Sequence, residues 1–253
     1  MLEDKYINII SKYISNLKFI FLYQFFIKKV DVKFVNEAHV FCQGESLRYH
    51  HNLCQNKRIL KPDIAVLANF EKNNLIDSNL KKDLSDVPII LVANITEPVL
   101  YFSNVIGIKL YKVFIARFRG KLLIRGSYLR TNCRLNKITN EVNYMPDELY
   151  SLYLKLFEND GKSNVGLLSL LIACHYKPKE IKIFGLDFYE SEYFDESLLS
   201  DMTVEHKQFV KNNSFFVKKS FFYIVRYFKN INFKIYTKAS LEISEKNLKV
   251  INL

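Results

Sequence analysis

The sequence has 253 residues, is 49% hydrophobic and carries a formal net charge of +11, which together suit one globular domain with a substantial core and an anionic partner. Its four cysteines show no CxxC pair and no zinc-type spacing, and no secretory signal opens the chain, so the sequence predicts reduced thiols in a cytoplasmic protein. It has no RGG tract or other nucleic-acid motif, so we expect no nucleic-acid partner.

Residues 5–28 have helical periodicity, with lysines at positions 12, 18, 28 and 29 interrupting or flanking the apolar positions. The largely apolar stretch between the lysines, residues 19–27, is much shorter than the roughly 20 residues that span a bilayer. Three alternatives follow for this helix: packing on the domain, a homo-oligomer contact, or peripheral contact with anionic lipid of the inner membrane.

Strands and helices alternate beyond residue 36. Predicted strands are residues 37–41, 63–68, 87–93, 180–184 and 233–236, with weaker candidates at 111–114 and 121–124. Helices are predicted after residue 47, near 146–157, from Gly166 onward and over 214–229. This alternation of largely apolar segments predicts an α/β fold with a mostly parallel sheet that helices cover on both faces.

Polar residues follow three of these strands: Gln43 and Gly44 after the first, Asn69 after the second and Asn94 after the third. Ligands of open α/β sheets collect at the carboxyl ends of the strands. Amides suit recognition of ribose, base and phosphate, and Gly44 would let the backbone approach a phosphate. The alternative is that each asparagine is an ordinary turn residue.

The strand 180–184 leads into Gly185-Leu-Asp-Phe-Tyr189. Asp187 and Tyr189 thus leave the sheet at its ligand-binding edge. Asp187 could bind a ligand hydroxyl or cap the loop through backbone N–H groups, and the alternative for the whole segment is a plain turn with a buried aromatic residue. Lys162, Ser163 and Asn164 precede the Gly166 helix and could meet an anion at its N-terminus.

These motifs, in this order, resemble those of the small bacterial lipooligosaccharide sialyltransferases. In that family the first strand runs into Gly-Asn-Gly-Pro-Ser-Leu; here the loop is CQGESL, in which Gly44, Ser46 and Leu47 match. The next two strands each end in an asparagine, as at Asn69 and Asn94, and Gly185 to Tyr189 match the family's Gly-Ile-Asp-Phe-Tyr with one conservative change. The resemblance covers roughly residues 36 to 236.

The resemblance implies a single Rossmann-like domain over residues 36–253, a short lid at about 189–212, and an extra N-terminal helical extension over residues 1–35. It implies an inverting transfer of sialic acid or a related nonulosonic acid from a CMP-sugar to a cell-surface glycan, either lipooligosaccharide or capsule, which can be lipid-linked. Tyr189 and a second lid tyrosine, Tyr193, would stabilise the departing phosphate, and His206 would be the general base. The remaining implied contacts with substrate or nucleotide are Gln43, Gly44, Ser46, Asn69, Asn94, Lys162, Ser163, Asn164, Gly185 and Asp187.

The resemblance implies no metal and no cofactor, and the absence of an Asp-x-Asp motif agrees with that. Three alternatives stay open. The altered first loop and a shorter lid fit a CMP-Kdo-type transferase, a related Rossmann-like pyrophosphokinase would need magnesium, and an inactive basic protein would only bind the membrane surface.

Overall fold

The computed structural model describes residues 35–70, 78–93, 110–115, 142–144, 164–191, 212–242 and 245–253, together with single positions at 149, 152, 155, 204, 205 and 208. The helix predicted over residues 5–28, the strand over 121–124 and most of the predicted lid lie outside these residues. Among the helices within them, none combines the length and the apolar character needed to cross a membrane.

One eight-stranded sheet runs through the molecule, and all seven pairs of neighbouring strands in it are parallel. Its strands are β1 (Glu37–Phe41), β2 (Ile64–Ala68), β3 (Ile89–Ala93), β4 (Leu110–Ile115), β5 (Val142–Tyr144), β6 (Glu180–Phe184), β7 (Asn232–Thr237) and β8 (Leu248–Asn252). They lie in the order β5-β4-β3-β2-β1-β6-β7-β8. The predicted parallel α/β sheet is confirmed, whereas the sequence analysis missed β5 and β8.

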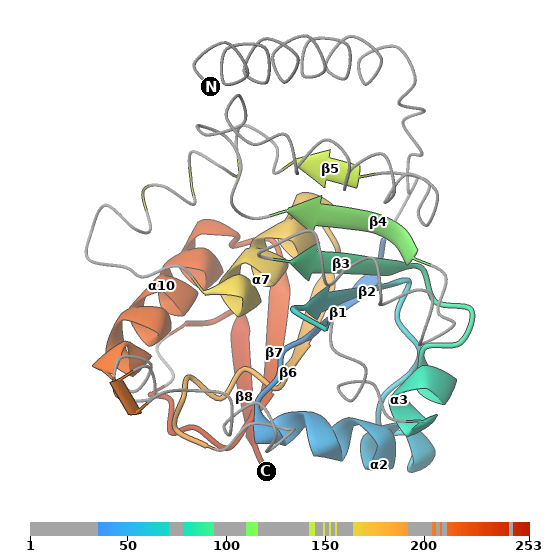
Figure 1. Ribbon diagram of the computed structural model, residues 1–253, viewed down its shortest axis with the longest axis horizontal. Coiled ribbons are helices and arrows are strands. Elements are labelled where there is room, and N and C mark those ends of the chain that lie inside the picture. The colour runs from blue at the N-terminus through green and yellow to red at the C-terminus, as the bar shows by residue number, and fades with distance from the viewer. Residues whose placement is uncertain are drawn as a thin grey trace, which may run out of the picture.

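Helices cover both faces of the sheet, as Figure 1 shows. On one face, α7 (Val165–His175) and α10 (Ser214–Tyr227) pack on Ala38, Val40 and their neighbours. On the other, η1 (Glu45–Tyr49), α2 (His50–Gln55) and α3 (Ser78–Asp83) lie over the side of β1 that carries Phe41. Because both faces are covered, β2 is buried at every residue, which explains its unbroken apolar sequence.

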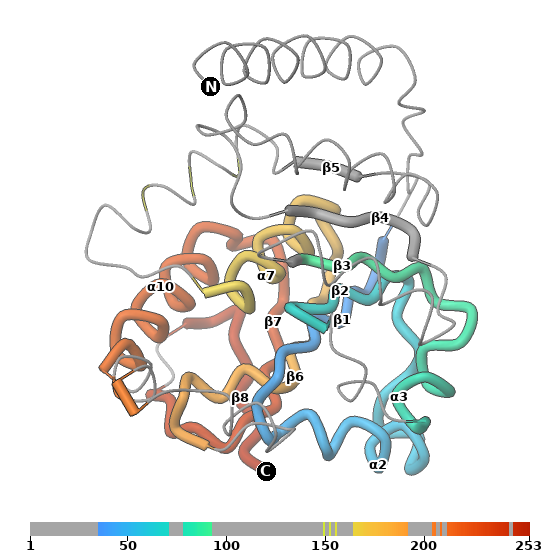
Figure 2. The backbone as a smooth tube through the Cα atoms, in the orientation of Figure 1, coloured from blue at the N-terminus to red at the C-terminus, as the bar shows by residue number. Residues whose placement is uncertain are grey.

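The order of the strands reverses next to β1. From β1 the chain builds the sheet outward through β2, β3, β4 and β5, and then returns to place β6 against the other side of β1. The tube in Figure 2 follows this path from β1 in blue to β7 and β8 in red. Loops that leave β1 and β6 in opposite directions open a crevice at their carboxyl ends, where open α/β sheets bind ligands.

Candidate functional site

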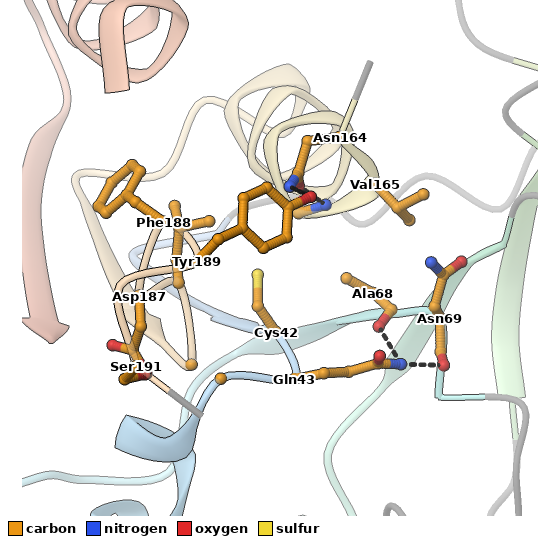
Figure 3. Close-up of a pocket in the computed structure, with 14 residues that line it drawn as sticks. Cys42, Gln43, Ala68, Asn69, Asn164, Val165, Asp187, Phe188, Tyr189 and Ser191 are labelled. Atoms are coloured by element: carbon orange, nitrogen blue, oxygen red, sulfur yellow. Dashed lines mark hydrogen bonds between the residues drawn. The ribbon is translucent and has the colours of Figure 1, made fainter. Parts of the chain in front are cut away.

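A pocket lies in that crevice, between the carboxyl ends of β1, β2 and β6 and the first turn of α7 (Figure 3). Its lining comes from four segments that are far apart in the sequence: residues 42–44, 68–69, 164–166 and 185–191. The lining residues are Cys42, Gln43, Gly44, Ala68, Asn69, Asn164, Val165, Gly166, Gly185, Leu186, Asp187, Phe188, Tyr189 and Ser191. Seven of the predicted site residues are therefore brought together here.

The floor of the pocket is a close crossing of the loops that follow β1 and β6. The Gly44 N–H donates to the Gly185 carbonyl over 2.8 Å, and Gly185 has a φ of +71°, which favours glycine. A Cβ at Gly185 would lie 2.2 Å from the Cys42 carbonyl oxygen, and one at Gly44 would lie 2.5 Å from Asp187 Oδ2. Glycine at position 44 thus permits this packing, and its N–H is engaged inside the protein.

Asp187 holds three segments of the chain together. Its carboxylate is 3% exposed; Oδ2 accepts from the Ser46 N–H (2.8 Å) and the Ser191 hydroxyl (2.9 Å), and Oδ1 accepts from the Thr237 hydroxyl (2.9 Å) and the Lys238 N–H (3.1 Å). The sequence left two roles open for Asp187, binding a ligand hydroxyl or capping the loop. These hydrogen bonds are those of a cap.

Ser46 has a similar internal role. It is fully buried, its hydroxyl accepts a hydrogen bond of 2.9 Å from the Gly185 N–H, and it does not line the pocket. Ser46 was predicted to contact the ligand, and in the structure it fixes the Gly185 loop instead.

The amide of Gln43 joins the ends of β1 and β2. Gln43 Nε2 donates to the carbonyl of Ala68 over 3.3 Å and also to the carbonyl of Asn69. Asn69 has a φ of 55°, a left-handed conformation that asparagine adopts more readily than most residues. Both side chains lie on the pocket wall opposite Tyr189 (Figure 3).

Tyr189 and Asn164 meet at the first turn of α7. Asn164 is the N-cap of this helix: its Oδ1 accepts from the backbone N–H groups of Gly166 (2.6 Å) and Leu167 (3.3 Å). This fixes the orientation of the amide, whose Nδ2 then donates to the Tyr189 hydroxyl oxygen over 2.5 Å. The tyrosine hydroxyl is therefore positioned at the positive end of the helix dipole.

The backbone that carries Tyr189 is strained. Phe188 and Tyr189 have φ values of 52° and 63°, and two consecutive aromatic residues in this region are rare. Such conformations cost about 1–3 kcal/mol each and cluster at functional sites. Phe188 is 2% exposed and packs edge-on against Phe221 with ring centroids 5.4 Å apart, which holds the turn in place.

Cys42 lines the pocket but is not suited to act as a nucleophile. Burial, with the nearby carboxylate of Asp187, raises the pKa of this thiol well above its ordinary range. The thiol thus stays protonated near neutral pH, whereas nucleophilic attack needs the thiolate.

Five predicted site residues lie outside the described residues: Asn94, Lys162, Ser163, Tyr193 and His206. The sequence analysis missed other residues of the site, among them Phe188, Ser191 and the clamp formed by Thr237 and Lys238. Thr237 directly follows the predicted strand 233–236, so the rule that selected Asn69 could also have selected it.

No family model and no curated protein matches the chain. Among solved structures, it is similar to the monofunctional α-2,3-sialyltransferase Cst-I from Campylobacter jejuni, with a TM-score of 0.50 and 14% identity over 86% of this chain and 80% of that one. The chain has the fold of this sialyltransferase. It is also similar to the sialyltransferase CstII from the same organism in complex with cytidine-5'-monophosphate, with a TM-score of 0.48 and 13% identity over 83% of each chain. The Rossmann-like α/β fold implied by the family resemblance is confirmed by the parallel sheet and by the likeness to Cst-I, whereas the predicted lid and N-terminal extension stay predictions.

Proposed function

We propose that this protein is an inverting glycosyltransferase, which moves sialic acid or a related nonulosonic acid from a CMP-sugar to a glycan of the lipooligosaccharide or capsule type. The observation that carries this proposal is the Tyr189 hydroxyl, held by Asn164 at the N-terminus of α7 inside the pocket at the sheet's switch point. The likeness in fold to Cst-I, an α-2,3-sialyltransferase, supports the same chemistry.

The pocket offers stabilisation for a departing phosphate. Cleavage of a CMP-sugar passes through an oxocarbenium-like transition state, and negative charge grows on the phosphate as the sugar leaves. The N-terminus of α7 favours that charge. The Tyr189 hydroxyl, which Asn164 holds beside this N-terminus, is a donor of the kind that stabilises charge developing on a phosphate.

We propose that the transfer needs no metal. Asp187 is the only acidic residue among the described residues that line the pocket, and both of its oxygens already accept hydrogen bonds from the protein. A magnesium ion bound through phosphates usually also needs one or two protein carboxylates. The helix N-terminus and the tyrosine hydroxyl would therefore take over the neutralisation of charge.

The remaining roles follow the family resemblance. Gln43 and Asn69, at the ends of β1 and β2, would contact the nucleoside, with Asn94, Lys162 and Ser163 completing the donor site. Tyr193 would be the second donor to the phosphate. Residues 5–28 would rest on the cytoplasmic face of the inner membrane, where lipid-linked acceptors are made.

His206 is the proposed general base for the acceptor hydroxyl, because an imidazole with a pKa of about 6.5 suits proton transfer near neutral pH. We expect His206→Ala to abolish transfer to an acceptor while the affinity for CMP, measured by calorimetry, stays within about twofold. Transfer at the wild-type rate by this variant would remove the assigned role.

The deciding experiment is CMP release from CMP-sialic acid by the purified protein, with EDTA present and no acceptor. Slow release by hydrolysis, accelerated by an acceptor glycan, is the expected result. The absence of release, together with no rise in melting temperature on addition of CMP, would overturn the proposal. If CMP raised the melting temperature but CMP-sialic acid released no CMP, CMP-Kdo would be tested next. Turnover of CMP-Kdo would identify the eight-carbon acid as the donor sugar.

A further inference from the structure

A second cluster of reactive side chains lies on the sheet face opposite α7, away from the pocket. α2 and α3 pack side by side there (Figures 1 and 2). His50 opens α2, Cys54 follows four residues later on the same face of that helix, and Asp83 is the last residue of α3. One ligand atom from each of the three lies within 4.8 Å of the other two.

The separation of His50 and Asp83 matches that of two ligands in a tetrahedral metal site. Zinc bonds of about 2.0–2.3 Å place two ligand atoms of such a site about 3.3–3.6 Å apart. His50 Nδ1 lies 3.4 Å from Asp83 Oδ2, and Cys54 Sγ lies 3.9 Å from His50 Nδ1 and 3.5 Å from His50 Nε2. The His50–Asp83 pair thus already has the separation of two zinc ligands, whereas the Cys54 side chain would have to rotate to bring its sulfur to an ion at Nδ1.

Burial keeps the imidazole in the state that a metal needs. His50 is 2% exposed, with its ring 4.8 Å from those of both Phe41 and Phe184. Burial, together with the neighbouring His39 and His51, lowers the pKa of His50 to about 3, so this ligand is neutral. Burial and then the charge of Asp83 raise the pKa of Cys54 to about 11, so without a cation the thiol keeps its proton.

The charges of the cluster balance a divalent cation. When the ion binds, the Cys54 proton passes to solvent, and the thiolate and the Asp83 carboxylate together carry two negative charges. The bound site is then neutral overall, which suits its burial between α2, α3 and the sheet.

His51 supports the carboxylate from outside. Its Nδ1 lies 3.2 Å and 3.1 Å from the two oxygens of Asp83, and its Nε2 accepts from Gln55 Nε2 over 2.8 Å. The Gln55 amide therefore directs the imidazole hydrogen to Nδ1, from which it is donated to Asp83. Hydrogen-bonded outer partners of this kind orient metal ligands and raise metal affinity.

We propose that His50, Cys54 and Asp83 bind a zinc ion, with water as the fourth ligand and His51 as a positioning residue for Asp83. A thiolate, an imidazole and a carboxylate in a tetrahedral arrangement select zinc over the hard cations calcium and magnesium. The ion would fasten α2 to α3. It has no part in the transfer chemistry.

The test is a titration of the whole, untagged protein with Co²⁺ after treatment with a chelator, followed by competition with Zn²⁺. We expect one equivalent to bind, with a thiolate-to-cobalt absorption band that zinc abolishes, and Zn²⁺ to raise the melting temperature. Cys54→Ala should lose the band and Asp83→Asn should weaken binding. The matched control Cys174→Ala, at a buried cysteine of α7, should keep both the absorption band and the wild-type metal affinity.

His51→Ala should keep the band and lower zinc affinity by about 10–100-fold. A thiolate band that survives in Cys54→Ala, or no band in the folded wild-type protein, would overturn the proposal. If Cys54→Ala does not fold, Asp83→Asn decides, since unchanged zinc affinity in that variant would also overturn it. None of these readouts depends on transfer activity, so they stand or fall separately from the proposed function.

Discussion

Tyr189 has a strained backbone, and its hydroxyl is held in place by Asn164. The contribution of this hydroxyl to turnover can be measured by removing it. We expect Tyr189→Phe to lower turnover of the CMP-sugar by about 10²–10³-fold, because one donor to the developing charge is lost. The affinity for CMP should change much less, since the hydroxyl acts chiefly in the transition state. Kinetics with saturating donor would separate the two effects.

The control for this variant is Tyr223→Phe, which removes a hydroxyl from a partly exposed position of α10 that does not line the pocket. It should retain wild-type turnover. Equal turnover in the Tyr189 and Tyr223 variants would contradict the role of Tyr189 at the phosphate.

At the scale of single residues, the sequence predicted position better than role. The strand-end rule brought Gln43, Asn69 and Tyr189 correctly to one pocket. It left the role of Asp187 open, because the decision depends on Thr237, which is 50 residues further along the chain. The contact between Tyr189 and Asn164, 25 residues apart, was likewise invisible without the fold.

Between β1 and β6, a polar cluster crosses an otherwise apolar sheet. Glu37 Oε1 lies 2.6 Å from both His39 Nε2 and Lys182 Nζ, and the side chain of Lys182 is only 8% exposed. Burial raises the pKa of Glu37, but the hydrogen bonds from His39 and Lys182 outweigh it and lower that pKa to about 2. The two strands are thus joined by a charged pair as well as by their backbone.

This lowered pKa predicts how stability depends on pH. Because the folded pKa lies below the unfolded value of 4.5, Glu37 stabilises the fold fully above that pH, and the contribution is lost as the pH falls towards about 2. We expect the wild-type protein to lose more stability than Glu37→Gln between about pH 6 and pH 3, measured by urea unfolding.

The matched variant for this comparison is Glu242→Gln, at an exposed carboxylate. Its loss of stability over the same pH interval should equal that of the wild-type protein. A wild-type loss no larger than that of Glu37→Gln would contradict the depressed pKa.

At the scale of elements, the sequence predicted the buried strands and missed the peripheral ones. The inner strands are largely apolar because helices cover both faces of the sheet, and this apolar pattern allowed their prediction from the sequence; they are β1, β2, β3, β6 and β7. β8 lies at the edge of the sheet with one residue buried, two partly buried and two exposed, so its hydrophobic pattern is weak. α3 has only one buried residue, Leu80, and β5 has three residues in all, too few for a periodicity.

For the whole molecule, the net charge of +11 predicts binding to anionic membranes. We expect the protein to float with vesicles that contain anionic lipid and not with neutral vesicles, and added salt to weaken the association because it screens exposed charges. Replacing the four lysines of the N-terminal segment with alanine should reduce the bound fraction most; these are Lys12, Lys18, Lys28 and Lys29.

A variant of equal charge keeps this test specific. It replaces four exposed lysines of the domain with alanine, namely Lys177, Lys229, Lys246 and Lys249. If both variants lost binding equally, the interaction would belong to the net charge rather than to the N-terminal segment.

The central place of β1 also sets an order of events during synthesis. Glu37 and Lys182, which pair across β1 and β6, are 145 residues apart, and a ribosome adds about 5–20 residues per second. For roughly 7–30 s, therefore, β1 remains in the nascent chain with one edge unpaired, next to the apolar strands β2 and β3. The pocket is completed later still, when Thr237 and Lys238 emerge and close on Asp187. Until then the half-built sheet exposes an unpaired strand edge and apolar surface, which is the state most prone to aggregate.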